Sequence, residues 1–329
     1  MRWSAAAHRF ALGLMAPVLA LGLSLPSAAW SQAFPNGPIT LIVPYPPGNT
    51  TDIVTRLMAR ALAERIGQPV VISNRGGAGG AVGAKAVQLA PPNGYTIGLI
   101  ASGHSIQPWL DKSMPFDIRK DFAQLNLNYT GEYIMVVPQS FPAKNLAEFI
   151  AYAKANPGKV NYGSTGLGTT THLGGEMIKQ AGKFEMTHVP YKGSTEVLQG
   201  VLTGDIQMYL DLYGTIEAQI KAGRLRPIVV LGQKRRANMP DVPALNETYP
   251  GMEVSAWTAY VAPLGTPKEI TDKLSSEIAA VMRMPEIRQK FAELGAEAGG
   301  MSGNDLSQFI LREYEKWGKV TVAAGMRPQ

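Results

Sequence analysis

The stretch ITLIVPYPPGNTTDIVTRLMARALAERIG, residues 39–67, holds one complete strand, loop and helix unit. Its first five residues form an apolar run that predicts a buried strand, and apolar residues recur at helical spacing through residues 51–66. Gly67 follows at the position where a glycine commonly ends a helix. Further strand-like runs at residues 70–73 and 95–102 alternate with a helical pattern. This alternation predicts an α/β fold with mostly parallel sheets.

A second series of strands and helices begins at Tyr133. The chain after about residue 256 reads as one strand followed by three helices, which we expect at residues 267–284, 285–294 and 304–324. A lone strand is too little for a third domain, so this segment is expected to return to the first series. The predicted organisation is lobe 1, residues 34–134 plus 256–329, and lobe 2, residues 135–255, with a hinge and a cleft between them.

The N-terminal segment predicts a signal peptide. Two arginines and no acidic residue accompany an apolar run at residues 10–25, and small residues lead to a predicted cleavage after Ala33. The run is shorter than a membrane-spanning helix and Pro17 interrupts it, although a retained anchor is the alternative. The chain has no cysteine that could carry a lipid or form a disulfide. We expect a periplasmic protein that is not embedded in the membrane when mature.

The composition is that of an ordinary folded globular protein, with 45% hydrophobic and 17% charged residues. The formal net charge is +6, but no run of lysine and arginine concentrates it. The charge therefore does not favour a nucleic-acid partner, and it is compatible with anionic solutes.

The loop of residues 44–52, PYPPGNTTD, joins the first strand to the first helix. Gly48 and Asn49 are the residues that best tolerate a positive φ, and Thr50 or Thr51 can cap the helix. The loop would then present backbone N–H groups and hydroxyls at a positive helix end, which suits a carboxylate or phosphate. A plain capped turn, with Asp52 compensating the helix dipole, is the alternative.

A second loop of the same kind lies at residues 163–172, GSTGLGTTTH, again between a strand and a helix. Its glycines keep side chains away from the backbone, and its threonines supply short donors near a helix start. Two such loops, one in each lobe, could face each other and hold an anion from both sides. Ligand binding would then drive closure of the lobes.

Catalytic and cofactor motifs are not evident. No G-x-S-x-G nucleophile motif occurs, and the glycine-rich run at residues 76–83 fits neither the dinucleotide nor the P-loop spacing. We interpret that run as a tight strand-to-helix connection. His104, His172 and His188 lack metal-ligand spacing, and there is no cysteine to join them. We therefore expect no enzyme activity, no cofactor and no metal.

Several long motifs resemble the Bug/TctC family of periplasmic receptors of tripartite tricarboxylate transport systems. They occur in the family's order over nearly the whole chain after residue 33: LIVPYPPGNTTDIVTRLMARALAERIGQPVVISNRGGAGG, PPNGYTI, NPGKVNYGSTGLGTTTHL, HVPYKGS, PDVPALNE and APLGTP. The resemblance implies a two-lobed periplasmic-binding-protein fold of the type II, or Venus flytrap, kind. It also implies a solute-binding protein that closes around a small carboxylate and delivers it to subunits of a membrane transporter of the tripartite tricarboxylate type.

The resemblance also implies which residues bind the ligand. In the family the two loops hold one carboxylate through backbone N–H groups, short hydroxyls and ordered waters. Carried over by position, the binding residues are Tyr45, Asn49, Thr50, Thr51 and Asp52 in the first loop and Thr165, Gly168, Thr169 and Thr170 in the second, with Ser102 and Asp211 at strand ends. The family more often has glycines at positions 49 and 50, so this departure bears on which ligand is bound.

Other residues have weaker claims. His104 could contact a distal ligand group, and Tyr191 and Lys192 lie in a family motif in which Lys192 either senses ligand charge or is a surface lysine. Trp257 and Tyr260 are interpreted as packing residues near the second crossing between lobes.

The ligand class stays open among di- and tricarboxylates, amino-acid-like acids and aromatic acids. Asp52 and Asp211 would repel a second ligand carboxylate unless water, protonation or a ligand amine intervenes. Two other functions remain alternatives: a receptor that presents its ligand to a sensor kinase, and a periplasmic hydrolase or isomerase that uses Asp52.

Overall fold

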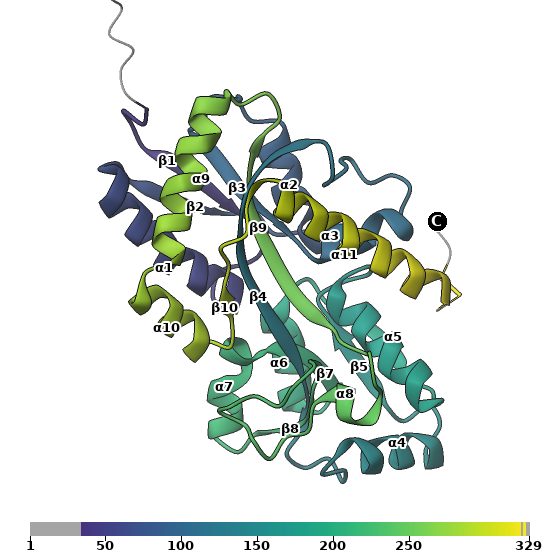
Figure 1. The fold of residues 1–329 in the computed structure, drawn as a ribbon. Helices are drawn as coiled ribbons and strands as arrows, with labels where there is room; N and C mark the ends of the chain where they lie inside the picture. Colours follow the sequence, from purple (N-terminus) through teal and green to yellow (C-terminus); the bar gives the residue numbers. More distant parts are fainter. Residues whose placement is uncertain (1–33, 324, 327–329) are drawn as a thin grey trace, which may run out of the picture. The chain divides into compact units, whose positions relative to one another are not determined.

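The computed structural model describes residues 34–323 and 325–326 (Figure 1). The predicted signal peptide, residues 1–33, lies outside the described residues. In the described part of the chain, no helix has both the length and the apolar character needed to cross a membrane.

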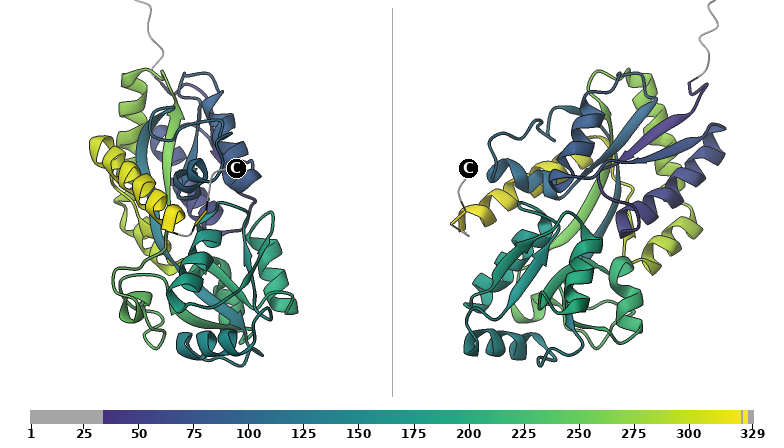
Figure 2. Two further views of the ribbon diagram at one scale, coloured as in Figure 1. Left: turned by 90° about the vertical axis from the view of Figure 1, so that its right-hand side faces the viewer. Right: turned by 180° about the vertical axis from the view of Figure 1, so that it is seen from behind.

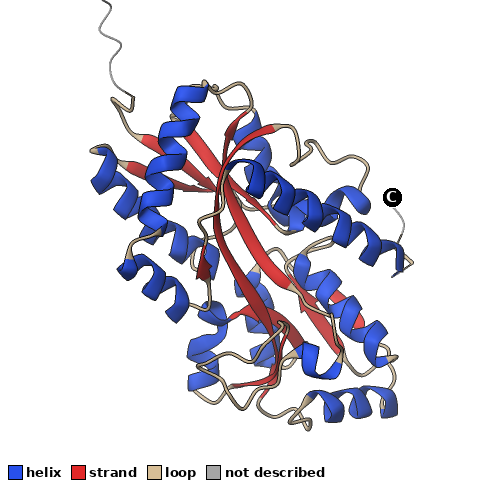
Figure 3. Cartoon of the chain, in the orientation of Figure 1, coloured by secondary structure: helices blue, strands red, loops and turns tan. Residues whose placement is uncertain are grey.

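One sheet, here called sheet A, is built on β1 (Ile39–Val43), which pairs in parallel with β2 (Val70–Asn74) and β3 (Thr96–Ala101). β9 (Ser255–Pro263) runs antiparallel to β3 and to β4 (Phe122–Pro138), and the short β10 (Glu297–Ala298) pairs with β4. Helices cover both faces (Figure 3). α1 (Thr50–Ile66), α9 (Lys268–Met282) and α10 (Pro285–Glu293) pack on one face, and α2 (Ala81–Gln88) and the start of α11 (Gly303–Ala323) pack on the other.

The second sheet, sheet B, contains β5 (Asn161–Ser164), which pairs in parallel with β6 (Thr187–Pro190) and β7 (Met208–Leu212). The end of β4 runs antiparallel to β7 and to β8 (Leu225–Val230). α4 (Leu146–Ala155) and α5 (Thr170–Gly182) pack on one face, and α6 (Ser194–Thr203) and α7 (Tyr213–Lys221) pack on the other. The short α8 (Leu245–Thr248) follows β8 along the chain.

β4 belongs to both sheets. It pairs with β9 over residues 122–132 and with β7 from Tyr133 onward. The chain returns just before β9, where the Val254 N–H bonds to the Leu231 carbonyl of the sheet B side. Figures 1 and 2 show β4 and β9 running side by side between the two groups of helices. The residue ranges of the two lobes stay a prediction.

The α/β fold is confirmed, and the strand after residue 256 completes sheet A as expected. The sheets are mixed, however, and not mostly parallel. The reason is that β4 passes from sheet A into sheet B as one strand and β9 runs beside it in the opposite direction. Each pairing that these two strands make is antiparallel. The sequence also gave no sign of α7, of β10 or of the short α3 (Gly103–Ile106).

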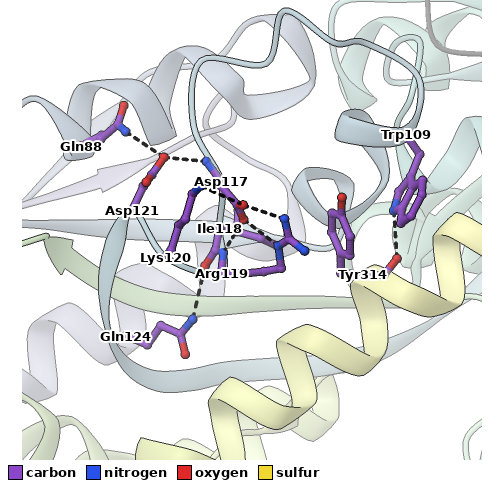
Figure 4. A network of polar contacts seen from close by, with 9 residues as sticks. All are labelled: Gln88, Trp109, Asp117, Ile118, Arg119, Lys120, Asp121, Gln124 and Tyr314. Atoms are coloured by element: carbon purple, nitrogen blue, oxygen red, sulfur yellow. Dashed lines mark hydrogen bonds and ion pairs between the residues drawn. The ribbon is translucent and has the colours of Figure 1, made fainter.

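The connection that leads from sheet A into β4 is fixed by two aspartates (Figure 4). The Asp117 N–H donates to the Asp121 carboxylate at 2.7 Å, and Asp117 pairs with Arg119 at 2.7 Å. The Arg119 guanidinium lies 4.1 Å from the centroid of the Tyr314 ring on α11. Trp109 donates its indole N–H to the Tyr314 carbonyl at 3.0 Å. These contacts join the start of β4 to α11.

Helix α5 lies unusually close to β5. A Cβ atom added at Gly175 would lie 2.3 Å from the Tyr162 ring, so the helix can approach the strand this closely only with glycine there. The Tyr162 hydroxyl donates to the Glu176 carboxylate at 2.7 Å, which fixes the rotation of the helix. This packing sets the position of Thr170, the first residue of α5.

We predict that Gly175→Ala lowers the free energy of unfolding by about 1–3 kcal/mol, because the added methyl group overlaps the Tyr162 ring. Intrinsic helix propensity alone would favour alanine by about 1 kcal/mol. Ser276→Ala on the exposed side of α9 is the matched control and should be nearly neutral. Urea unfolding measures both variants, and an unchanged or raised stability of Gly175→Ala would contradict the packing argument.

Candidate functional site

The loops that follow the parallel strands of both sheets meet at one cavity of about 750 Å³, counting its opening to solvent. This is the edge at which ligands bind in open α/β sheets. The lining residues come from the loops after β1, β2, β3, β5, β6 and β7 and from β4 and β9: Pro44, Tyr45, Pro46, Asn49, Thr50, Thr51, Gly77, Gly79, Gly80, Ala101, Ser102, Gly103, Tyr129, Tyr133, Thr165, Thr169, Thr170, Thr171, Lys192, Gly193, Ser194, Asp211, Leu212, Thr215, Ala256, Trp257 and Thr258.

The first loop is held by Asn49 and Asp52. Asn49, and not Thr50 or Thr51, is the N-cap of α1: its side chain accepts from the Asp52 N–H at 2.9 Å. Gly48 has a φ of 92°, as expected for this turn. This cap leaves the side chains of Thr50 and Thr51 free to face the cavity.

Asp52 does not line the cavity, because its carboxylate points into the loop. One oxygen accepts from the Gly48 N–H at 3.0 Å and from Arg56 at 2.9 Å, and the other accepts from Asn74 at 2.8 Å. Burial alone would raise the pKa of Asp52, but these hydrogen bonds outweigh it and lower the pKa. A carboxylate engaged in this way stiffens the loop and is not placed to act as a general base on a bound molecule.

Thr50 and Thr51 bring the first turn of α1 to the cavity. The Thr50 N–H donates to the Thr215 hydroxyl at 3.3 Å, and the two threonine hydroxyls lie 3.1 Å apart. The Thr51 hydroxyl shares a 2.6 Å hydrogen bond with the hydroxyl of Tyr129 on β4. The residues that present α1 to a ligand are therefore bonded to β4 and to α7.

The second loop is a network of threonine hydroxyls. Thr169 is the N-cap of α5 and also donates its hydroxyl to the Gly166 carbonyl at 2.8 Å. The Thr171 hydroxyl accepts from the Thr165 N–H at 3.1 Å. Gly168 lies behind this surface and donates its N–H to the His172 ring at 3.2 Å. Of the predicted residues of this loop, Thr165, Thr169 and Thr170 line the cavity and Gly168 does not.

Two side-chain contacts join the loops of sheet A to those of sheet B. The hydroxyls of Ser102 and Thr170 lie 2.8 Å apart, and Thr50 meets Thr215 as described above. Both contacts are at the cavity wall. The loops of sheet A and the loops of sheet B are therefore in direct contact in this structure.

Asp211 is the buried acidic group of the cavity. Its side chain accepts from the Tyr209 hydroxyl and from the Leu212 N–H, the latter at 2.7 Å. Burial raises the pKa of Asp211 to about 6, although these bonds and the hydroxyls of Ser194 and Thr215 act in the opposite direction. Lys192 is the other charged side chain among the described residues that line the cavity.

Two of the weaker candidates, His104 and Tyr191, do not line the cavity. His104 is fully buried behind the cavity wall, where its Nδ1 accepts from the Ala101 N–H at 3.2 Å and its ring meets Phe116 edge to face. Burial lowers the pKa of His104 to about 4. Tyr191 packs against Gly163 and Gly200 and does not line the cavity, whereas Tyr45 does.

Several lining residues were not predicted. Thr215 stands in the first turn of the unpredicted α7. Tyr129 lies in the part of β4 before the predicted strand, and Tyr133 begins that predicted strand but was not named as a binding residue. The glycine-rich run is the tight connection that we expected, and three of its residues, Gly77, Gly79 and Gly80, also line the cavity with positive φ. The glycine-rich run directly follows a parallel strand, and this position could have identified it as part of the site.

Trp257 and Tyr260 are packing residues, as interpreted from the sequence. Both are buried; Trp257 donates to Glu313 at 3.1 Å and Tyr260 donates to Asn128 at 2.8 Å. Trp257 also touches the cavity. In residues 34–323 and 325–326 there is no group of three or more His, Cys, Asp or Glu side chains that could hold a metal ion.

Comparison with known proteins gives consistent matches along the chain. Residues 54–326 match the family described as the tripartite tricarboxylate transporter family receptor, TctC. The UPF0065 protein in the tcbD-tcbE intergenic region of Pseudomonas sp. (strain P51) is 33% identical over 306 residues, which cover 92% of this chain and 91% of that protein.

Two solved structures have the same fold. Periplasmic binding protein BugD is 30% identical, with a TM-score of 0.85 over 90% of this chain and 100% of BugD. R. palustris Rpa4515 with adipate is 34% identical, with a TM-score of 0.86 over 90% of this chain and 100% of that one. These matches confirm the resemblance to the Bug/TctC receptors and the two-lobed periplasmic-binding-protein fold.

The buried His104 should make the protein less stable at acidic pH. Its pKa is about 4 in the folded protein and about 6.5 in an unfolded chain, so the unfolded state binds more protons between these values. The free energy of unfolding should therefore fall as the pH falls from 6.5 to 4, by up to about 3 kcal/mol from this residue. His104→Asn, which keeps an acceptor for the Ala101 N–H, should flatten that pH dependence in urea unfolding at pH 7 and pH 4.5. An equal loss of unfolding free energy between pH 7 and pH 4.5 in the variant and the wild type would disprove this role of His104.

Proposed function

Since this chain belongs to the tripartite tricarboxylate transporter family receptors, a family of periplasmic solute-binding proteins, we propose that it captures a small carboxylate and delivers it to membrane transporter subunits of the tripartite type. In this proposal the signal peptide is removed after Ala33 and the mature protein acts in the periplasm. Capture occurs as lobe 1, residues 34–134 plus 256–329, closes on lobe 2, residues 135–255, about the hinge in β4 and before β9.

The observation that carries the proposal is the convergence of helix N-termini on one cavity. Lining residues lie at the N-terminal ends of α1, α2, α5, α6 and α7. The N-terminus of a helix has the effect of roughly half a positive charge and offers N–H groups that lack partners in the helix. Five such ends around one cavity favour an anion far more than a neutral solute, and Lys192 adds to this preference.

The first turns of α1 and α5 are the anchors that we assign to one ligand carboxylate. Thr50 and Thr51 on α1, which packs on sheet A, and Thr169 and Thr170 at the start of α5, which packs on sheet B, all line the cavity. Each supplies a hydroxyl beside a helix N-terminus, which is suitable for charge-assisted hydrogen bonds to a carboxylate. The similar Rpa4515 structure contains adipate, a dicarboxylate, which supports the same ligand class here.

Closure follows from the same contacts. The Ser102 to Thr170 and Thr50 to Thr215 hydrogen bonds form only when the two sets of loops meet. A carboxylate held by both α1 and α5 has contacts in the closed form that it lacks in an open one, so its binding shifts the population toward closure. A closed, ligand-bound form is what a transporter can distinguish from the empty protein.

The proposal is tested by thermal unfolding of purified residues 34–329 with mono-, di- and tricarboxylates, aromatic acids and amino acids. A true ligand stabilises the protein by about 2.7 kcal/mol at a hundredfold excess over its Kd. Analysis of the same mixtures for product tests the enzyme alternative. Stabilisation by no carboxylate, or turnover of any of them at a useful rate, would remove the basis of the proposal.

Loss of a single anchor hydroxyl should weaken the best carboxylate of that panel. We predict that Thr51→Val and Thr170→Val each reduce affinity by about 1–2 kcal/mol, because each removes a hydrogen bond at the anion. Thr271→Val on α9, whose hydroxyl bonds to the Lys268 carbonyl far from the lining residues, is the matched control. Isothermal titration calorimetry measures the three variants. Affinities equal to that of the wild type for all of them would show that the Thr51 and Thr170 hydroxyls serve only their bonds to Tyr129 and Ser102.

A further inference from the structure

Asp211 lines the cavity that a ligand would enter. It lies at the end of β7, is 5% exposed, and lines the cavity together with Thr215 and Ser194. The Thr215 hydroxyl meets Thr50 at the first turn of α1, the helix assigned to the ligand carboxylate. Thr215 thus lies between Asp211 and the first turn of α1.

No cation neutralises Asp211. None of the ion pairs of the described residues includes it. It accepts from the Tyr209 hydroxyl and the Leu212 N–H, and the nearby Ser194 and Thr215 hydroxyls also favour its charged form. The other titratable groups near it are Tyr129 and Tyr133 on β4, whose pKa values burial raises above the ordinary range, so that they are neutral at physiological pH.

The remaining charged group of the cavity is Lys192, on the turn between β6 and α6. It lines the cavity but no hydrogen bond or ion pair to Asp211 forms. The helix N-termini are therefore the main positive partners of Asp211 in the cavity, and these are the same groups that must attract an anionic ligand.

A dicarboxylate and an ionised Asp211 compete for those helix ends. One ligand carboxylate can bind at α1 and α5, but the second brings a like charge into a cavity that already holds a buried one. Like charges at close range make the protonated form of one of them more favourable. Asp211 is the better proton acceptor, because burial already raises its pKa to about 6.

We propose that Asp211 determines which carboxylates the cavity accepts: it takes up one proton from solvent when a dicarboxylate binds and then donates a hydrogen bond to the second ligand carboxylate. The inference rests on the proposed function and adds the ligand class and the ionisation state of the site. No covalent bond forms or breaks except the O–H bond of the Asp211 carboxyl. Ligands with an ammonium group in place of the second carboxylate would instead require an ionised Asp211.

The experiment compares matched ligands on the intact mature protein. Succinate, glutarate and adipate are each paired with the ω-amino acid of the same carbon number: 4-aminobutanoate, 5-aminopentanoate and 6-aminohexanoate. Titration calorimetry at pH 6, 7 and 8, in buffers of different ionisation enthalpy, gives the Kd and the number of protons taken up. We expect a dicarboxylate to bind better than its amino acid partner. Its Kd should fall by up to tenfold for each unit of pH decrease, with uptake approaching one proton.

Asp211→Asn tests the residue, since the amide keeps the shape but cannot take up the proton. It should bind the dicarboxylate with a Kd that no longer depends on pH and, at pH 8, with at least the wild-type affinity. Asp205→Asn, which removes an exposed carboxylate of the same lobe whose partner is Thr203, is the control and should keep the wild-type pH dependence. If Asp211→Asn fails to fold, the wild-type protein still keeps the proposal falsifiable, since binding of a dicarboxylate without proton uptake would overturn it.

Results that contradict the role of Asp211 differ from those that contradict the proposed function. Tighter binding of the amino acids, or a dicarboxylate Kd that is constant from pH 6 to 8, would overturn the role of Asp211. So would binding of other carboxylates with none of these six ligands bound, although the proposed function would stand. Only the failure of every carboxylate in the wider panel would overturn the proposed function itself.

Discussion

The first N–H groups of a helix have no acceptor within that helix, and the site of this protein depends on that deficit. Parallel strands place the starts of their following helices at one edge of a sheet, and here two sheets turn those edges toward one cavity. The site needs few charged side chains because the backbone supplies the positive potential. Its precision then depends on how firmly the loops are held, and Asp52, Asn74 and Arg56 do this for the first loop without reaching the cavity.

The mixed sheets follow from the same arrangement. Two sheets whose loops face each other must be connected by chain that passes between them, and β4 makes this passage as one continuous strand. Register shifts at Gln124 to Asn126 and at Leu127 to Tyr129 interrupt its pairing with β9. Such irregularities bend a strand pair and increase its twist. β4 also carries Tyr129 and Tyr133 into the cavity, so the connection between the sheets is part of the site itself.

Local signals made the strand-to-helix units predictable. Apolar spacing and the glycines and threonines of residues 44–52 and 163–172 identified both loops, because each loop is encoded within about ten residues. What could not be predicted depends on contacts distant in sequence. Asp52 faces Asn74 and not the cavity, and Thr215 meets Thr50 across 165 positions. Gly168 differs, because its bond to His172 is local and depends on the conformation of the loop, which composition alone does not reveal. The side chains of a loop can thus be listed from sequence more readily than they can be oriented.

A cavity lined by helix N-termini has little means of distinguishing one anion from another, since N–H groups recognise a carboxylate and not what is attached to it. A group whose own charge changes with the ligand adds a discrimination that N–H groups lack. Buried hydroxyls such as those of Ser102 and Thr170 can reorient but cannot change charge. Asp211 can, because burial raises the pKa of this carboxyl to about 6 while the Tyr209 hydroxyl and the Leu212 N–H keep it in place. An acidic residue inside an anion site is therefore not a contradiction: it makes the charge of the site respond to the charge that enters it.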